Sequence, residues 1–300
     1  MKPAPFYYHA PSSLDEALGL LRDLRDEDAK VLAGGQSLMP MLNMRLARAN
    51  HLVDINGLRE LDYAREERSG LAMGALTRHR TLERSADVAR RIPLLTEAIP
   101  QVGDRQVRFR GTLGGSLAHA DPAAELPTIA VALDAEMVVR SRSGTRTVRA
   151  ADFFLSFFTT VLEPDELLTE VRFPAFPARS GCAFLELTRQ LGAYPIVSAA
   201  AVVSIDDGRI ADVRLALGGV GETPIRAHGA EAALRGQRPT LEVLTEAGRL
   251  AADDTDPGAD VHGSAEYRKE MAAVYARRAL QTAADRAISL PLDGGGLGRG

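Results

Sequence analysis

The sequence predicts an α+β protein built from two domains. Its 300 residues exceed the length of one average domain. Helix and strand patterns are interspersed in the first half, whereas in the second half the strands come first and the helices follow. A proline-rich stretch at residues 173–181 interrupts both patterns. We expect a first domain over residues 1–176 with subdomains at about 1–56 and 57–176, a C-terminal domain over 177–288, and a disordered tail over 289–300.

The first subdomain is predicted to be a small α/β unit. Ser13 and Glu16 form a potential capping box, and apolar residues then recur at helical spacing. Short apolar runs at residues 30–33 and 51–55 are typical of strands, and the first run stops at a glycine pair. This order of helix, strand, glycine turn and strand indicates an α/β arrangement.

The second subdomain is predicted to contain a mixed or antiparallel sheet. Residues 136–142 and 145–149 flank a Ser-Gly turn and are predicted to form a hairpin, and a further strand is expected at residues 167–173. A helix is predicted to begin at Asp121, with that residue as N-cap and a proline at the first helical position, and to end near Leu133.

The C-terminal domain is predicted to be a three-stranded antiparallel sheet covered by helices. The second and third strands are joined by a short polar turn that is typical of a hairpin. The expected strands span residues 182–188, 196–205 and 210–217, and the expected helices span 227–234, 241–252 and 265–288.

Composition excludes several classes of protein. The net charge of −4 and the interspersed charges argue against nucleic-acid binding. No apolar run is long enough for a signal peptide or a membrane helix, so we expect no membrane span and a cytoplasmic location. The single cysteine, Cys182, excludes an internal disulfide and any thiolate-ligated metal cluster made within this chain, and it has no local catalytic signature.

Two glycine pairs stand where a diphosphate could bind. One is in residues 33–38, directly after a predicted strand, and the other is in residues 111–117. Paired glycines allow close backbone approach and several converging N–H donors, and a hydroxyl residue follows each pair. A single glycine pair is more often only a turn, but two such pairs together could hold one dinucleotide. Neither has the spacing of a Walker loop or of a Rossmann fingerprint.

Weaker candidates remain open or favour structural roles. A third glycine cluster at residues 217–224 is interpreted as a structural loop, because a proline replaces the third glycine and no helix follows it. Paired His and Asp residues are more typical of an exposed histidine and a helix cap than of a metal site, and we predict none. Three arginines beside the second glycine pair are equally consistent with phosphate binding and with a solvated face. These weaker candidates are His119 with Asp121, His51 with Asp54, and Arg105, Arg108 and Arg110.

Two longer motifs resemble one family. Residues 33–46, AGGQSLMPMLNMRL, and residues 112–125, TLGGSLAHADPAAE, are similar to the FAD-binding medium subunit of the molybdenum hydroxylases. The family includes carbon monoxide dehydrogenase, xanthine dehydrogenase and bacterial dehydrogenases of N-heterocycles. The resemblance covers nearly the whole chain, since a Leu-Gly-Gly-Val-Gly loop at residues 217–221 also matches. It implies an FAD domain of two subdomains followed by a C-terminal α+β domain.

The resemblance also implies which residues hold FAD. The first loop would wrap the diphosphate through backbone N–H groups and a serine hydroxyl, and the second would do likewise. A glutamate would bind the adenosine portion through its carboxylate. Other residues would pack near the flavin, and a tyrosine would lie over its ring. The implied residues are Val31, Leu32, Ala33, Gly34, Gly35, Gln36, Ser37 and Leu38; Thr112, Gly114, Gly115 and Ser116; Glu125; Val102 and Gly103; Leu168; and Tyr194.

Departures from the family pattern lie in the C-terminal domain. Relatives often carry a lysine near Leu185 or Glu186 and an acidic residue just before the aromatic one, but this chain has no lysine there and has Ala193 in the acidic place. Pro195, directly after Tyr194, is also unusual for the family. Polar control of the flavin potential or of acceptor access is therefore expected to differ.

The expected function is electron transfer. By the resemblance, a large molybdopterin subunit oxidises the substrate, a small subunit relays electrons through two [2Fe–2S] clusters, and FAD in this chain passes them to an external acceptor. The complex would be a dimer of such heterotrimers. Two alternatives are a self-sufficient FAD-dependent oxidase or dehydrogenase and a nucleotide-binding assembly factor. We find no acid–base residues that favour the former, and predict no catalytic residue.

Overall fold

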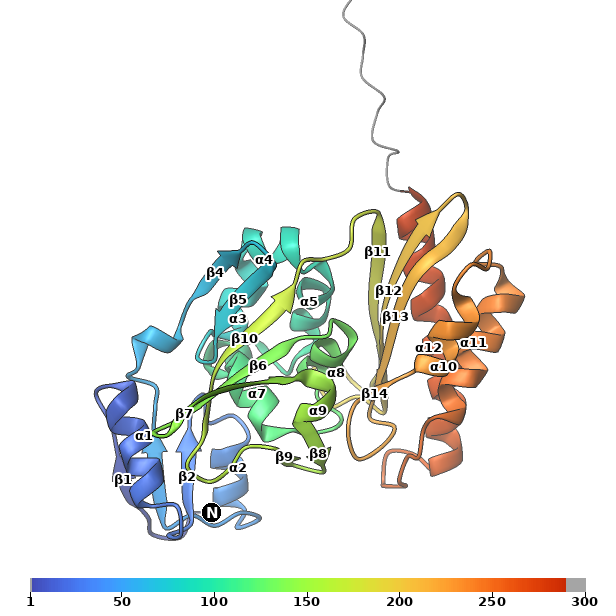
Figure 1. Cartoon of the computed structure of the whole chain (residues 1–300). Coiled ribbons are helices and arrows are strands. Elements are labelled where there is room, and N and C mark those ends of the chain that lie inside the picture. Colours follow the sequence, from blue (N-terminus) through green and yellow to red (C-terminus); the bar gives the residue numbers. More distant parts are fainter. Residues whose placement is uncertain (1, 290–300) are drawn as a thin grey trace, which may run out of the picture.

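The computed structural model describes residues 2–289 and arranges them around three larger β-sheets (Figure 1). The N-terminal sheet is parallel with strand order β1-β3-β2. Ser13 Oγ accepts a hydrogen bond from Glu16 N, so the predicted cap of α1 is confirmed. A short helix, α2, follows the first glycine pair and was not expected. The elements of this part are β1 (Tyr7–His9), α1 (Leu14–Asp23), β2 (Ala29–Leu32), α2 (Leu38–Asn43) and β3 (His51–Asp54).

The central sheet is antiparallel and has the order β4-β5-β10-β6-β7. The predicted hairpin is confirmed, because residue 141 pairs with residue 144 at the turn between β6 and β7. The strands are β4 (Ala64–Glu67), β5 (Gly70–Gly74), β6 (Glu136–Ser141), β7 (Gly144–Arg149) and β10 (Leu167–Pro174), and a separate pair is β8 (Phe154–Ser156) and β9 (Thr159–Thr160).

Several short helices pack beside the central sheet, and most of them were not predicted. Their length explains this, since one or two turns give little periodicity to detect. They are η1 (Arg59–Leu61), α3 (His79–Arg84), α4 (Ala86–Arg91), α5 (Pro93–Ala98), η2 (Ile99–Gln101), α6 (Arg105–Arg110), α7 (Leu113–His119), α8 (Glu125–Ala132) and α9 (Ala150–Phe153).

The predicted start of α8 at Asp121 is wrong. The Asp121 carboxylate accepts a hydrogen bond from Ala123 N, and the Asp121 carbonyl accepts one from Ala124 N. These bonds close a turn before the helix, which therefore begins four residues later, at Glu125. This shift places the Glu125 side chain, 4% exposed, at the buried start of the helix.

The C-terminal sheet has four strands rather than the predicted three, in the order β11-β12-β13-β14. The extra strand, β14, is only two residues long, too short to show alternation. Helix α12 ends at Ser289, which was expected in the tail; the rest of that tail, residues 290–300, lies outside the described residues. The elements are β11 (Ser180–Leu187), β12 (Val197–Asp206), β13 (Arg209–Gly218), β14 (Ile225–Arg226), α10 (His228–Leu234), α11 (Leu241–Asp253) and α12 (Ala265–Ser289).

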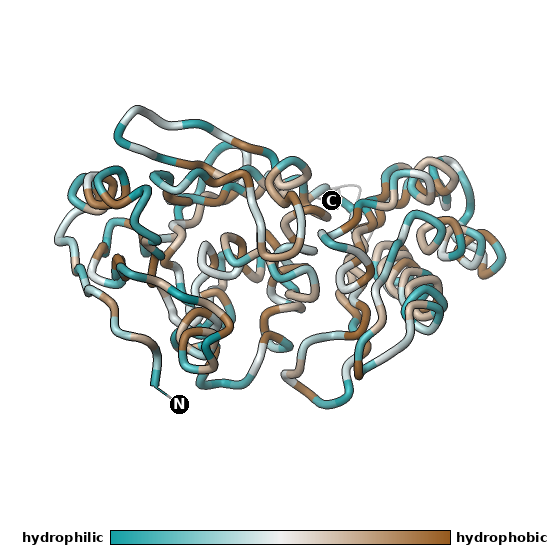
Figure 2. The backbone as a smooth tube through the Cα atoms, turned by 90° about the horizontal axis from the view of Figure 1, so that it is seen from below, coloured by the Kyte–Doolittle hydropathy of each residue, from teal (hydrophilic) through white to brown (hydrophobic). Residues whose placement is uncertain are grey.

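The C-terminal sheet is buried on both faces. On one face, residues such as Ala183 and Val203 join a core made with α10, α11 and α12. On the other face, Cys182, Phe184 and Ala200 join the core formed by the central sheet and the helices beside it, which we call the central part. Hydrophobic segments accordingly lie toward the inside of each part and along this sheet (Figure 2). Within residues 2–289 no helix combines the length and hydropathy that crossing a membrane requires.

The half-buried Arg226 of β14 joins the C-terminal sheet to α8 and the residues that follow this helix. Arg226 pairs with Glu231 through its Nε, and its Nη1 donates to Asp134 Oδ1 at 2.8 Å and to the Val131 carbonyl at 3.1 Å. The Arg226 side chain is 10% exposed and that of Glu231 is 2% exposed. Without Arg226, the buried Glu231 carboxylate would keep the Leu215 N–H at 2.8 Å and Arg235 at 3.7 Å, so a buried charge would be only partly compensated.

We predict that Arg226→Ala lowers the free energy of unfolding by about 2 kcal/mol, because the buried Glu231 carboxylate loses its main charged partner and keeps only the Leu215 N–H and the longer contact with Arg235. Urea unfolding followed by circular dichroism measures this. The matched control is Arg249→Ala, whose side chain is 58% exposed in its ion pairs, and which should change stability by no more than about 0.5 kcal/mol. Equal effects of the two variants would contradict the assignment.

Candidate functional site

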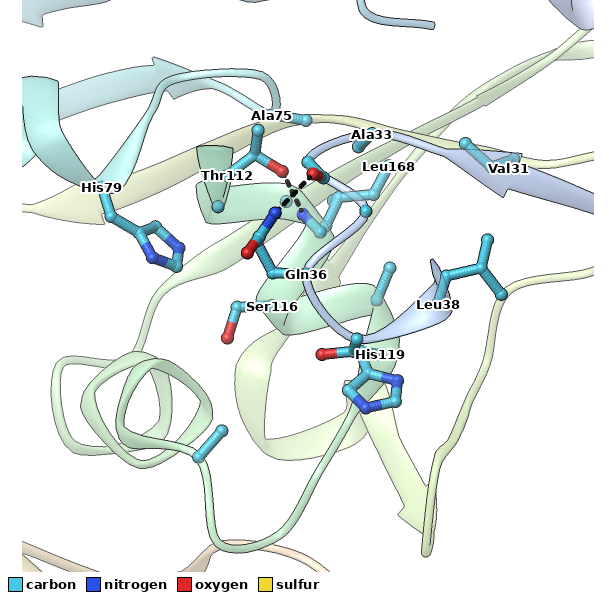
Figure 3. A pocket seen from close by; sticks show the side chains of 18 of the residues that line it. Val31, Ala33, Gln36, Leu38, Ala75, His79, Thr112, Ser116, His119 and Leu168 are labelled. Carbon is cyan, nitrogen blue, oxygen red and sulfur yellow. Dashed lines mark hydrogen bonds between the residues drawn. The ribbon is translucent and has the colours of Figure 1, made fainter. Parts of the chain in front are cut away.

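A cavity of about 500 Å³ lies between the N-terminal sheet, the central sheet and the loop that follows β11. Its walls come from the turn after β2, the start of α3, helix α7, the start of α8 and the beginning of β10 (Figure 3). Gly192 and Tyr194 of the C-terminal part also line it. The volume is in the range of small-molecule and cofactor sites.

The turn after β2 offers free backbone donors to this cavity. Gly35 has φ of +74°, which lets the chain reverse directly after the strand. Among the described residues, the backbone N–H groups of residues 34–38 have no hydrogen-bond acceptor. The first carbonyl of the turn, that of Gly34, accepts from the Gln36 side chain at 3.2 Å. Successive free N–H groups of this kind form a concave anion-binding site.

The second glycine motif is helical rather than a loop. Thr112 is the N-cap of α7, and its hydroxyl accepts a hydrogen bond from Gly115 N. The N–H groups of Leu113 and Gly114 donate to the carbonyls of Thr77 and Ala75. The backbone donors at the start of α7 are therefore engaged within the protein, and the helix offers the side chains of Ser116 and His119 to the cavity.

Two of the glycines bring backbone segments into contact. A Cβ at Gly34 would overlap the carbonyl oxygen of Arg110, and a Cβ at Gly114 would overlap Ala75. Arg78 reinforces the first contact, since its guanidinium donates to the Arg110 carbonyl at 2.5 Å and to Asn56 Oδ1 at 2.7 Å. The two motifs are thus held together before any ligand enters.

Arg108 has a structural role. Its guanidinium donates to the carbonyls of Val102 and Gly103 at 3.1 and 2.9 Å and lies 3.5 Å from the Glu83 carboxylate. It therefore fixes the segment that lines one end of the cavity. Arg105 lies over the Phe109 ring at 5.6 Å. Neither of these two arginines points to phosphate binding.

His79 is a cavity residue that the sequence analysis missed. It stands at the start of α3, directly after a loop that leaves β5, and only 4% of it is exposed. Neither ring nitrogen has a hydrogen-bond partner among the described residues. Burial, and to a lesser extent Arg108 and Arg78, lowers the pKa of His79 to about 4, so the imidazole is neutral at pH 7. Figure 3 shows its ring beside the same space as Gln36 and Ser116.

Glu125 and Tyr194 close the cavity on the side of the C-terminal sheet. Burial raises the pKa of Glu125 to about 7, and the nearby Asp121 carboxylate contributes to this. Tyr194 is 58% exposed as a whole, but its hydroxyl end lies among protein groups, which raises the pKa of the phenol by desolvation and through Asp121. The Glu125 carboxyl in this wall therefore binds a proton more readily than an exposed glutamate does.

The structure gathers the expected residues into this one cavity, with one exception. Leu32 does not line it, because its side chain packs beneath the turn, close to where a Cβ of Gly35 would lie. The cavity residues missed by sequence reasoning include Lys30, His79, Glu166 and Gly192. No local pattern marks them, since they lie on separate elements that only the fold brings together.

Comparison with known proteins decides the family. Residues 4–176 match the model described as the FAD binding domain in molybdopterin dehydrogenase, and residues 182–283 match the CO dehydrogenase flavoprotein C-terminal domain. This chain belongs to the family of FAD-binding subunits of the molybdopterin dehydrogenases. The resemblance and the α+β fold class predicted from the sequence are thereby confirmed.

Individual members of this family are similar over almost their full length. The chain is 41% identical to the 6-hydroxypseudooxynicotine dehydrogenase complex subunit alpha of Paenarthrobacter nicotinovorans over 96% of this chain and 97% of the relative. It is 40% identical to the carbon monoxide dehydrogenase medium chain of Hydrogenophaga pseudoflava over 94% and 98%. A solved structure of the enzyme from that organism superposes with a TM-score of 0.93, at 42% identity, over 95% of this chain and 99% of the other.

The other candidates from the sequence have structural roles. Gly219 N donates to the Pro122 carbonyl and Val220 is fully buried, so the third glycine cluster joins the C-terminal sheet to the segment before α8. Cys182 is buried, and burial raises the pKa of its thiol to about 12. In the part of the chain that the structure describes, no three His, Cys, Asp or Glu residues are grouped as metal ligands.

We predict that Gly34→Ala lowers the free energy of unfolding by about 1–3 kcal/mol, because the methyl group overlaps the Arg110 carbonyl and forces the two motifs apart. The same variant should lose bound FAD, as measured by flavin absorbance after gel filtration. Gly19→Ala, in α1 with open space around it, is the control, and should raise stability by up to about 1 kcal/mol. A Gly34→Ala protein as stable as the parent would contradict this contact.

A second prediction concerns acid sensitivity. The pKa of His79 is lower in the folded protein than in the unfolded chain, so its contribution to stability is complete above pH 6.5 and is lost as pH falls toward 4. From pH 7 to pH 5 this loss amounts to about 2 kcal/mol. In urea titrations, the free energy of unfolding of the parent minus that of His79→Gln should therefore fall by about 2 kcal/mol from pH 7 to pH 5. The exposed His262→Gln variant should keep the parental slope; the same slope in His79→Gln would show that His79 does not titrate in this way.

Proposed function

We propose that this chain is the electron-transferring flavoprotein subunit of a molybdenum hydroxylase complex. The observation that carries the proposal is the cavity formed between the free N–H groups of residues 34–38 and the Ser116 face of α7. A diphosphate suits such a row of neutral donors, which need no charged partner to bind an anion. The exposed Lys30 at the same cavity supplies positive charge at its rim.

The proposed FAD contacts follow from this arrangement. The amides of Gly34 to Leu38 and the hydroxyls of Ser37 and Ser116 would hold the diphosphate. The segment at Val102 and Gly103, fixed by Arg108, would support the ring system, and Tyr194 would cover it from the C-terminal part. We propose residues 1–176, with subdomains 1–56 and 57–176, as the FAD-binding domain and residues 177–288 as the domain that closes it.

Partner subunits are part of the proposal. FAD supplies the ability to take up electrons singly and to release them as a pair. Iron–sulfur clusters require several thiolates, and the one cysteine of this chain is buried and protonated. We therefore propose that a small [2Fe–2S] subunit delivers electrons from a large molybdopterin subunit, in a dimer of heterotrimers in the cytoplasm, and that an external acceptor removes them. The relative named for 6-hydroxypseudooxynicotine makes an N-heterocyclic compound our proposed substrate class.

The test uses the purified full chain. It should bind one FAD, and the bound flavin should be bleached by a reduced [2Fe–2S] protein under anaerobic conditions but not by small organic substrates alone.

Ser37→Ala should weaken FAD binding about fivefold, since one hydrogen bond contributes about 1 kcal/mol. Ser289→Ala, far along the chain in α12, should leave it unchanged. Direct bleaching by an N-heterocycle would overturn the electron-transfer function in favour of a self-sufficient dehydrogenase, and a chain without affinity for FAD would overturn both.

A further inference from the structure

The loop between β11 and β12, residues 188–196, brings two residues of the C-terminal part to the cavity, Gly192 and Tyr194. It leaves the sheet after Leu187 and returns at Ile196, whose N–H donates to the Leu187 carbonyl at 2.7 Å. Tyr194 is 58% exposed, so packing around its own side chain holds it only weakly. The backbone on either side of Tyr194 is held more firmly.

On one side of Tyr194, the loop packs against the cavity segment at Gly103. Gly192 has φ of +80°, and a Cβ built on it would lie 2.9 Å from the Gly103 carbonyl oxygen. Glycine alone adopts this backbone conformation readily and leaves room for the contact. The Gly103 carbonyl also accepts a hydrogen bond from Arg108 at 2.9 Å. This side of the loop therefore lies against a segment that Arg108 already fixes.

On the other side, the buried Arg268 in the first turn of α12 holds the Ile196 carbonyl. Its Nη1 donates to this carbonyl at 2.6 Å and to the Gly219 carbonyl at 3.3 Å, and its Nη2 lies 2.8 Å from Asp260 Oδ1. Arg268 is 7% exposed. Hydrogen bonds from a charged donor are stronger than neutral ones. The guanidinium therefore connects the end of the loop to the segments after β13 and before α12.

The groups around Arg268 are themselves fixed. The Asp260 carboxylate accepts hydrogen bonds from the N–H groups of His262 and Gly263 at 2.8 and 3.2 Å. A Cβ built on Gly219 would lie 2.9 Å from the Ile196 carbonyl oxygen, so this glycine packs directly against the group that Arg268 binds. The Ile196 carbonyl is therefore confined by both a hydrogen bond and a close backbone contact.

Pro195 transmits this restraint to Tyr194. It is the single residue between Tyr194 and Ile196. Its ring fixes its own φ at about −65°, and it restricts the residue before it to extended backbone. Because these backbone dihedrals are restricted, fixing Ile196 also limits where Tyr194 can lie. The proline that departs from the family pattern thus has a physical role in this chain.

We propose that Arg268 is a positioning residue for Tyr194: by holding the Ile196 carbonyl, its guanidinium keeps the loop of residues 188–196 closed against the cavity, so that the Tyr194 ring covers bound FAD. This rests on the proposed function, because it takes Tyr194 as part of the FAD site. Arg268 does not itself line the cavity, so it acts through the loop. Its hold on the loop can therefore be tested without FAD.

The first test is the rate at which trypsin cleaves the apoprotein after Arg189, an exposed residue of the loop, followed by mass spectrometry. Arg268→Ala should raise this rate about tenfold, because the loop opens more often once its charged hydrogen bond is lost. The rate after Arg179, in the exposed turn before β11, should stay at the parental value. Lys269→Ala, which removes the exposed neighbouring cation on α12, is the control and should cleave as the parent does.

Two outcomes would overturn the proposal. One is an unchanged rate after Arg189 in Arg268→Ala. The other is an equal increase after Arg189 and Arg179, which shows general destabilisation instead of loop opening. Where Arg268→Ala does not fold, Arg268→Lys decides: a single ammonium cannot take the places of both Nη1 and Nη2, so the rate after Arg189 should rise about threefold. The parental rate in that variant would also overturn the proposal.

The second test asks whether Arg268 acts through Tyr194, and it uses the dissociation constant of FAD for the full chain, measured by equilibrium dialysis. Arg268→Ala should raise this constant about fivefold in the parent but less than about twofold in a Tyr194→Ala background, where the ring to be positioned is absent. The same factor in both backgrounds would overturn the positioning role. A parent without affinity for FAD, whose Arg268→Ala variant still opens at Arg189, would instead contradict only the proposed FAD site.

Discussion

The close contact between the turn at Gly34 and the carbonyl of Arg110 is the constraint on which the candidate site depends. It joins the N-terminal sheet to the segment that leads into α7. The Arg78 guanidinium donates a hydrogen bond to the same Arg110 carbonyl and so stabilises the contact. The turn must therefore carry a glycine for packing reasons alone. The free N–H groups of residues 34–38 belong to this same turn, which lines the cavity together with α7, so the glycine that packing requires lies among the donors of the site.

The two glycine motifs contribute differently. In the first, glycines permit a positive φ and leave the amides free. In the second, the N–H groups at the start of α7 are already hydrogen-bonded within the protein. Gly114 has no side chain there, which lets the helix pack closely against Ala75. The two similar sequence patterns therefore have different roles. The first forms an anion-binding turn, and the second forms a tightly packed helix. The C-terminal part completes the enclosure with Gly192 and Tyr194, which lie in the loop after β11.

Much of this arrangement could be predicted from the sequence. The capped first helix, the hairpin at residues 136–149 and the long strands of the C-terminal sheet have strong periodicity or turn signals, and they are confirmed. The start of α8 could not be predicted, because the Asp121 side chain is equally suited to capping a helix and to closing a turn. His79 carries no local signal, since its surroundings come from elements far away in the sequence. It becomes visible only through its buried ring nitrogens, which have no partner among the described residues.

The most direct test of the account is a crystal structure of the full chain with FAD. We predict electron density for one FAD in the cavity of Figure 3, with the diphosphate oxygens within hydrogen-bond distance of the amides of residues 34–38 and the Ser116 hydroxyl. Helix α7 should keep its own backbone hydrogen bonds in that complex. FAD bound at any other place, or a diphosphate held by the N–H groups of Gly114 and Gly115 instead of the first turn, would contradict the account.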